Sequence, residues 1–116
     1  MSASYEITDF GDLEGVPCPC GTARRALMED ESVPYSFHLT EISQEARPHY
    51  HKRLTETYFI LECKPDACME LDGQLVPIKP HTAITIKPGT RHRAVGEMKV
   101  VIVASPKFDP QDEWFD

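Results

Sequence analysis

The stretch PHYHKRLTETYF, residues 48–59, places two histidines and a glutamate directly ahead of, and at the start of, a strand-like run. His49 and His51 are two residues apart, so in an extended backbone both imidazoles point to the same side. Once a strand begins, Glu56 shares its face with Tyr58. Ile60 lies on the same face, so Glu56 would place a carboxylate among apolar side chains. Burying that charge costs free energy unless a partner such as a cation balances it. Taken alone, the stretch is compatible with a metal site and with a solvated surface segment.

A third histidine, His92, follows a proline–glycine turn in KPGTRH, residues 87–92, and must come from a different strand than Glu56. On its own it fits a basic turn, because Arg91 and Arg93 flank it. Side chains alternate along a strand, so we expect both arginines on the face opposite His92, at the outer surface or at a dimer edge. The joint order of the histidines and the glutamate indicates a site more strongly than any one of them.

Short strand patterns separated by turns run through most of the chain. Residues 35–42 alternate apolar and polar side chains, which is typical of a half-buried strand. Asp72-Gly73 predicts the tight turn of a hairpin. Residues 22–32 fit either a helix or a strand, and the context favours a strand. Roughly seven short strands at this spacing predict an all-β sandwich or barrel. The remaining strand segments are residues 55–61, 67–71, 74–78, 81–87, 91–95 and 98–106.

The composition limits the classes of function. At 116 residues the chain fits a single domain. Its net charge of −7 argues against nucleic acid or an anionic membrane as partner, since both require positive charge at the contact. Residues 1–15 have neither the basic nor the apolar region of a signal peptide, and the longest apolar run, residues 100–104, is far too short to span a membrane. We therefore expect a soluble, cytoplasmic protein.

Four cysteines are present, and their roles stay open at this point. Without a secretion signal, free thiols are favoured over disulfides. A four-thiolate zinc site lacks the usual CxxC spacing. Cys63 lies about 23 Å from Glu56 along an extended strand, at roughly 3.3 Å per residue, so it cannot share a site with that carboxylate. The cysteines are Cys18, Cys20, Cys63 and Cys68.

The order His-x-His-x4-Glu from His49 to Glu56, then a strand, a hairpin and a Pro-Gly-x-x-His turn, resembles the two motifs of the cupin superfamily. The resemblance covers residues 34–103. PCGTAR, residues 19–24, further resembles the first strand of small mannose-6-phosphate isomerase-like (RmlC-like) cupins. The resemblance implies an all-β double-stranded β-helix, or jelly-roll barrel, and often a homodimer. We assign the whole chain to one cupin domain, with an N-terminal arm at residues 1–17, the barrel at 18–105 and a tail at 106–116.

By this resemblance, four side chains would bind a divalent transition metal: His49, His51, Glu56 and His92. Such a donor set suits Fe, Mn, Ni or Zn, and leaves about two positions of a six-coordinate ion open. Four positions depart from the usual motifs, and they put the shape of the loops in doubt more than the ligands: Ser43, Cys63, His81 and Gly96.

Tyr58 shares the parity of Glu56 and His38 lies on an alternating strand, so both are candidates for the pocket lining, with a core position as the alternative for each. The resemblance implies a small-molecule ligand or substrate such as a sugar or an organic acid. Three classes of function remain open: a metal-dependent isomerase or dioxygenase, a binding module without turnover, and a structural cupin whose metal only stabilises the barrel.

Overall fold

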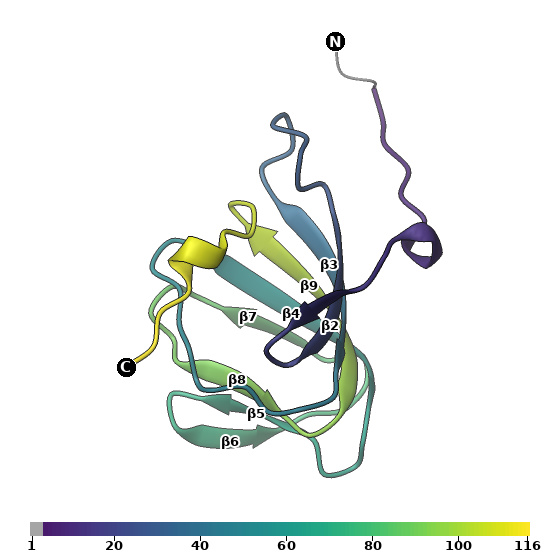
Figure 1. Cartoon of the computed structure of the whole chain (residues 1–116). Helices are drawn as coiled ribbons and strands as arrows, with labels where there is room; N and C mark the ends of the chain where they lie inside the picture. The colour runs from purple at the N-terminus through teal and green to yellow at the C-terminus, as the bar shows by residue number, and fades with distance from the viewer. Residues whose placement is uncertain (1–3) are drawn as a thin grey trace.

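Two antiparallel sheets make up the body of the protein in the computed structural model, which describes residues 4–116 (Figure 1). The larger sheet has the spatial order β1-β2-β3-β9-β4-β7, and the smaller has the order β6-β5-β8. The strands of the larger sheet are β1 (Val16–Cys18), β2 (Gly21–Ala26), β3 (Ser36–Ile42), β4 (Thr55–Cys63), β7 (Ala83–Ile86) and β9 (Met98–Ser105). The smaller sheet consists of β5 (Cys68–Leu71), β6 (Gln74–Pro77) and β8 (His92–Val95). Two short 3-10 helices, η1 (Phe10–Asp12) and η2 (Pro110–Asp112), belong to the terminal segments.

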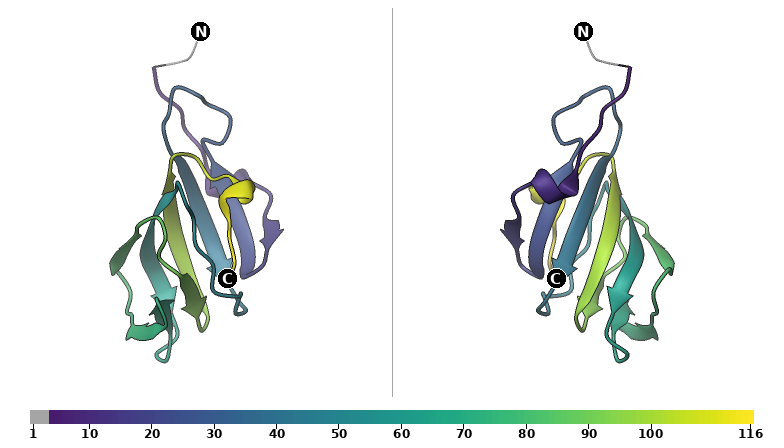
Figure 2. Two further views of the ribbon diagram at one scale, coloured as in Figure 1. Left: turned by 90° about the vertical axis from the view of Figure 1, so that its left-hand side faces the viewer. Right: turned by 90° about the vertical axis from the view of Figure 1, so that its right-hand side faces the viewer.

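The two sheets lie face to face, as the side views show (Figure 2). Strand β9 alternates strictly, with Met98, Val100, Ile102 and Ala104 buried between the sheets. Burying each large aliphatic side chain of this kind contributes about 1.5–3 kcal/mol to stability. Met98, Val100 and Ile102 form the apolar core with buried residues of both sheets, among them Ile60 of β4 and Met69 of β5, which confirms the predicted all-β barrel.

Strand β3 turns its polar side inward at one end. Ser36, His38 and Thr40 are buried, whereas Phe37 and Leu39 are only partly covered. Further along the same strand, Ile42 joins the apolar core. The interior therefore has an apolar end and a polar end. An inward row of polar side chains costs free energy unless the groups are hydrogen-bonded or used, so the polar end is where a site is expected.

The C-terminal tail folds back over the segment that carries the histidines. Tyr50 and Trp114 exchange backbone hydrogen bonds of 3.0 and 2.9 Å. The buried Asp112 carboxylate accepts the backbone N–H groups of Lys52, Arg53 and Leu54, each at 3.0 Å. The tail thus fixes the loop between His51 and β4.

The structure has nine strands among the described residues, and eight of them, β2 to β9, correspond to the predicted strand segments. Strand β1, which begins at Val16, was not predicted. The N-terminal segment before β1 carries the short helix η1. The ambiguous segment 22–32 is strand β2 in its first part, as favoured. No helix in residues 4–116 has the length and apolar character that a membrane-spanning segment requires.

Candidate metal centre

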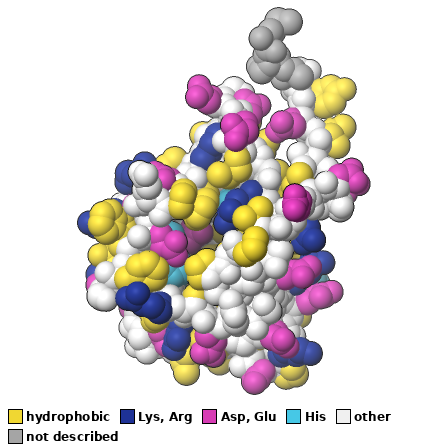
Figure 3. All heavy atoms as spheres, in the orientation of Figure 1, with side chains coloured by type: hydrophobic (Ala, Val, Ile, Leu, Met, Phe, Trp, Pro, Cys, Tyr) yellow, Lys and Arg dark blue, Asp and Glu magenta, His cyan; other side chains and the backbone are white. Residues whose placement is uncertain are grey.

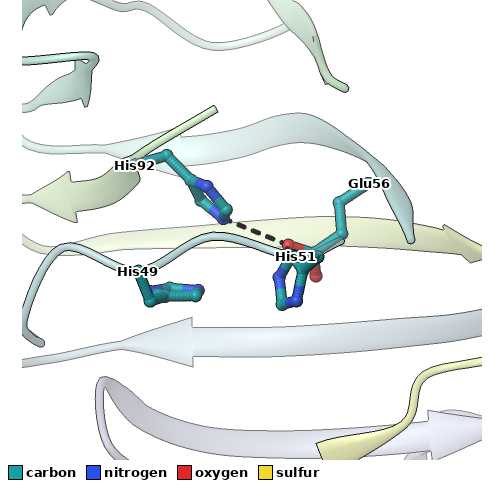
Figure 4. Close-up of side chains that lie close together, drawn as sticks. All are labelled: His49, His51, Glu56 and His92. Carbon is teal, nitrogen blue, oxygen red and sulfur yellow. Dashed lines mark hydrogen bonds and ion pairs between the residues drawn. The ribbon is translucent and has the colours of Figure 1, made fainter. Parts of the chain in front are cut away.

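The four predicted ligands come together at the polar end of the interior (Figure 4). Backbone pairing explains how: His49 N–H donates to the His92 carbonyl at 3.1 Å, and His92 N–H donates to the His49 carbonyl at 2.9 Å. This bridge aligns the segment around His49 with strand β8. Glu56 enters from the inner face of β4, and its residue surface is only 6% exposed.

The donor atoms are close enough to share one ion. One atom from each of the four side chains lies within 4.8 Å of the others. The Nε2 atoms of His51 and His92 are 2.8 and 3.2 Å from the same oxygen of Glu56. The rings of His49 and His92 have centroids 4.3 Å apart. The carboxylate and the imidazoles therefore converge on one point, and this cluster could hold a metal ion.

Each histidine is oriented through its other ring nitrogen. Nδ1–H of His51 donates to the Asp112 carbonyl at 2.7 Å, that of His92 to the Thr90 carbonyl at 2.9 Å, and that of His49 to the Arg47 carbonyl at 3.3 Å. A carbonyl oxygen only accepts, so Nδ1 must carry the proton in all three rings. Nε2 is then the nitrogen left for a metal, an arrangement expected of metal-binding histidines.

The charges of the cluster follow from burial and from mutual hydrogen bonds. Burial alone would raise the pKa of Glu56, but hydrogen bonds with Nε2 of His51 and His92 hold it well below its ordinary value, so the carboxylate is ionised. Donation from Nε2 requires a second proton on the ring, which a metal ion at Nε2 would replace. Burial, and next the neighbouring His92, lower the pKa of His49 to about 4. For His51, burial is outweighed by the Glu56 carboxylate, which raises its pKa. A buried anion among imidazoles is a donor set that a divalent cation fits.

A cavity of about 100 Å³ opens in front of the cluster. In the space-filling view, histidine atoms lie at the bottom of a hollow bordered by hydrophobic side chains (Figure 3). Both predicted lining residues, Tyr58 and His38, lie in the cavity wall. Burial, followed by the nearby Glu56 charge, raises the pKa of Tyr58 well above its usual range, so it remains a neutral phenol.

His38 is held by a short relay of polar groups. The hydroxyl of Ser36 lies 2.7 Å from Nε2 of His38, and Ser36 Oγ also accepts the backbone N–H of Phe108 at 2.9 Å. Burial, and next the positive charge of Arg25, lower the pKa of His38 to about 4. The imidazole is therefore neutral at physiological pH.

Arg25 is a cavity residue that the sequence analysis did not identify. It lies opposite His38 in the β2–β3 ladder, and its guanidinium carbon is 4.7 Å from the centroid of the Phe108 ring. Its Nε atom is buried without a hydrogen-bond partner, and within residues 4–116 no carboxylate forms an ion pair with it. In a strand, Arg25 lies on the same face as the buried Ala23, which would have placed it inside the barrel. That inference requires residues 22–26 to be known as a strand, and the sequence left helix and strand open there.

Other charged residues near the cluster differ in part from expectation. Arg91 faces outward as predicted, paired with Asp116 at 2.7 Å. Arg93 was predicted to face outward but contributes to the cavity wall, while it is paired with Glu70 at 3.1 Å. Glu113 was not foreseen: its carboxylate is 3.8 Å from Nε2 of His49. The four cysteines are free thiols. In the described part of the chain, the His/Glu cluster is the only group of side chains that could hold a metal ion.

Curated proteins related to this chain are L-ectoine synthases, although no family model matches the sequence. The synthase from Saccharophagus degradans is 34% identical over 86 residues, which are 71% of this chain and 64%, just under two thirds, of that protein. The synthase from Teredinibacter turnerae is 31% identical over 89 residues, which are 73% of this chain and 67% of that protein.

Solved structures agree on the fold. A protein from Planctomyces limnophilus has a TM-score of 0.94 and 42% identity, covering 97% of this chain and 98% of its own. Ectoine synthase from P. lautus has a TM-score of 0.76 and 17% identity, covering 95% of this chain and 88% of its own, and so shares the fold. With the sequence match to the synthases, the barrel topology and the ligand cluster, the chain belongs to the cupin superfamily, as a relative of the L-ectoine synthases.

Proposed function

We propose that this cupin is a metal-dependent enzyme that acts on a small organic acid by proton-transfer chemistry of the isomerase type. The observation that carries the proposal is the orientation of the three histidines: each Nδ1 is hydrogen-bonded to a backbone carbonyl, which leaves Nε2 for a ligand, and the Nε2 atoms of His51 and His92 are 2.8 and 3.2 Å from the buried Glu56 carboxylate. That support is far more elaborate than a solvated surface cluster requires.

The proposed ligands are His49, His51, Glu56 and His92, and Fe, Mn, Ni and Zn are the ions that this donor set suits. A bound divalent ion supplies a Lewis acid that polarises a substrate oxygen. The residues of the chain do the rest: they orient the substrate in the cavity, exclude water from it, and move a proton.

Arg25 favours an acid over a neutral sugar as the substrate. Its guanidinium is in the cavity wall, packed against Phe108, without a carboxylate partner in the described part of the chain. Arg25 is only partly exposed, and its buried Nε has no hydrogen-bond partner, so a substrate carboxylate could supply one through paired hydrogen bonds. Arg93, in the same wall, already has Glu70 as its partner.

His38 is the proposed proton carrier. Its Nε2 is engaged by Ser36, so Nδ1 is the nitrogen left to exchange a proton with a ligand in the cavity. The ring is neutral at physiological pH, as a general base must be, while the relay through Ser36 fixes its orientation. Proton transfer of this kind is required for isomerisation and for elimination, whereas a dioxygenase depends on iron and O₂.

The relatives support an enzyme, since the proteins that match in sequence are synthases of a small molecule. The finer assignments remain predictions: the mannose-6-phosphate isomerase-like subgroup, the homodimer and the cytoplasmic location.

Metal analysis of protein purified without an affinity tag tests the site. We expect close to one equivalent of a transition metal per chain, and His92→Asn should lose it. Protein that carries no metal and takes up none on titration would refute the metal site. Zinc, manganese or nickel agrees with isomerase-type chemistry, whereas iron with O₂ consumption would replace it by dioxygenase chemistry.

Ligand binding tests the substrate class. Small carboxylates should bind the metal-loaded protein more tightly than the corresponding amides, and Arg25→Gln should remove that preference. Arg24→Gln is the matched control, because Arg24 is its neighbour on β2 and bonds instead to the Leu13 carbonyl. Equal binding of acids and amides would overturn the organic-acid assignment. A carboxylate that binds in this way but is never turned over would leave a binding module.

A further inference from the structure

Two cysteines meet in the hairpin between β1 and β2. Cys18, the last residue of β1, pairs with Gly21, the first residue of β2, so Pro19 and Cys20 form the turn. The sulfur atoms of Cys18 and Cys20 are only 3.2 Å apart. Both residues also line the cavity in front of the metal cluster, although neither contributes a ligand to it.

We propose that Cys18 and Cys20 form a reversible thiol–disulfide site at the rim of the cavity, with Cys18 as the attacking thiolate and Cys20 as the resolving thiol. This modification site is independent of the proposed function, because it requires neither the metal nor a substrate.

The surroundings of Cys18 favour its thiolate. The hydrogen bond from the Cys20 thiol is the main cause, burial opposes it, and the backbone N–H groups of Cys20 and Gly21 and the charge of Arg25 add to it, so the pKa of Cys18 is lowered to about 6. The same hydrogen bond, together with burial, raises the pKa of Cys20. One thiolate beside one thiol is the division of roles that redox-active pairs use.

The oxidant is a low-molecular-weight disulfide. The Cys18 thiolate attacks one of its sulfurs, forming a mixed disulfide while the other half leaves as a thiolate. Cys20 then loses its proton and attacks the Cys18 sulfur, which forms the Cys18–Cys20 bond and releases the second half as a thiolate. Two electrons pass from the cysteines to the oxidant. One departing thiolate takes up the proton from Cys20, and the other takes up a proton from solvent, equivalent to the one that Cys18 lost when it ionised.

The geometry also explains why the bond would be reversible. The sulfurs need to approach only from 3.2 Å to about 2.05 Å. The bridge encloses the single residue Pro19, so it removes little entropy from the unfolded chain and contributes little stability. Strained or exposed bridges of this kind are readily reduced. Closing it would remove a thiolate from the cavity wall and tighten the turn there.

The test uses the full-length protein equilibrated in glutathione buffers from fully reduced to fully oxidised. Acid quenching, alkylation of free thiols and mass mapping report which cysteines are bonded. We expect the loss of two hydrogen masses in one transition, a Cys18–Cys20 linkage in the peptide map, and recovery with dithiothreitol. Cys18→Ser should leave Cys20 without a partner, and Cys20→Ser should accumulate the mixed disulfide on Cys18.

The control is the double variant Cys63→Ser/Cys68→Ser, which should keep the transition unchanged. The proposal is overturned if wild-type protein stays reduced in fully oxidised glutathione, if glutathione remains on Cys18 while Cys20 is still alkylated, or if the control loses the transition. If Cys18→Ser or Cys20→Ser fails to fold, the peptide map of oxidised wild-type protein still shows whether the Cys18–Cys20 bond forms. Metal content should be equal in both redox forms, so failure of the metal site and failure of this site are separate results.

Discussion

At the scale of single residues, Asp112 does two things for the candidate site. Its carbonyl accepts the Nδ1 proton of His51, and its carboxylate accepts three backbone N–H groups of the following loop, residues 52–54, and the Trp114 indole at 3.2 Å. Burial would raise the pKa of this carboxyl, but the N–H donors lower it to about 2. One residue of the tail therefore orients a proposed ligand.

Asp112→Asn should weaken both folding and metal binding. The asparagine amide has no charge, and its NH₂ group would face backbone N–H donors of residues 52–54, which it cannot accept. Losing a charge-assisted hydrogen bond and leaving a donor unsatisfied lowers the free energy of unfolding by about 1–3 kcal/mol. The substitution keeps the backbone carbonyl that accepts from His51, but it weakens the bonds that hold this carbonyl in place, so metal affinity should fall by up to about 10-fold, the low end of the range for ligand-orienting groups. Calorimetric titration with Zn²⁺ and thermal melting measure the two effects. Asp66→Asn, at an exposed position, is the control, and equal affinity in both variants would contradict the orienting role.

The pH dependence of stability gives a second test of Asp112. Because the folded-state pKa is lowered from 3.8 to about 2, its stabilisation is complete above the ordinary carboxyl value and is lost as pH falls toward the lowered value. Acid unfolding of wild-type protein should therefore include a loss of free energy between about pH 4 and pH 2 that is missing in Asp112→Asn. Parallel free-energy curves for both proteins over this range would contradict the assignment.

At the scale of elements, the hairpins differ in how closely their turns are packed. At Gly21, an added Cβ would collide with the backbone carbonyl of Glu41 on the neighbouring strand β3. At Gly73, in the β5–β6 turn with φ +84°, an added Cβ meets nothing. The β1–β2 hairpin therefore requires glycine for close approach, and the β5–β6 hairpin requires it only for its backbone angle.

These two glycines form a matched pair of substitutions. Gly73→Ala should cost about 1–2 kcal/mol, the cost of a left-handed residue with a side chain. Gly21→Ala should cost more than that, because β3 is held between β2 and β9 and cannot move aside. Urea unfolding measures both. A smaller loss at Gly21 than at Gly73 would mean that the hairpin can separate from β3.

At the scale of the whole molecule, the sequence was most informative where spacing alone constrains geometry. Alternation along a strand fixes which side chains share a face, so the sequence alone predicted that Tyr58 points inward. The order of the four proposed ligands along the chain was also enough to predict the cluster: His49, His51, Glu56 and His92. Arg25 was not predicted, because residues 22–32 fit a helix as well as a strand. Arg93 alternates with the buried His92 and Ala94 as expected, yet it also contributes to the cavity wall, which alternation along the strand does not predict.

The metal cluster also joins the two sheets, since Glu56 belongs to β4 of the larger sheet and His92 to β8 of the smaller one. An ion that binds only the folded protein stabilises it by about 2.7 kcal/mol at one hundred times its dissociation constant. Saturating Zn²⁺ or Mn²⁺ should therefore raise the melting temperature by several degrees. Imidazole ligands must be unprotonated, so the increase should disappear as pH falls below about 6.

Two histidine variants decide whether that increase comes from the cluster. His92→Asn removes a buried ligand and should abolish the metal-dependent rise in melting temperature. His81→Asn is the control, because His81 is exposed and its φ of 70° is tolerated by asparagine. If both variants keep the rise, the ion binds elsewhere. If only His92→Asn loses the rise in melting temperature, the ion binds at the cluster. If the metal-loaded wild-type protein then binds no carboxylate, the metal serves to hold the two sheets together, and the protein is a structural cupin and not an enzyme.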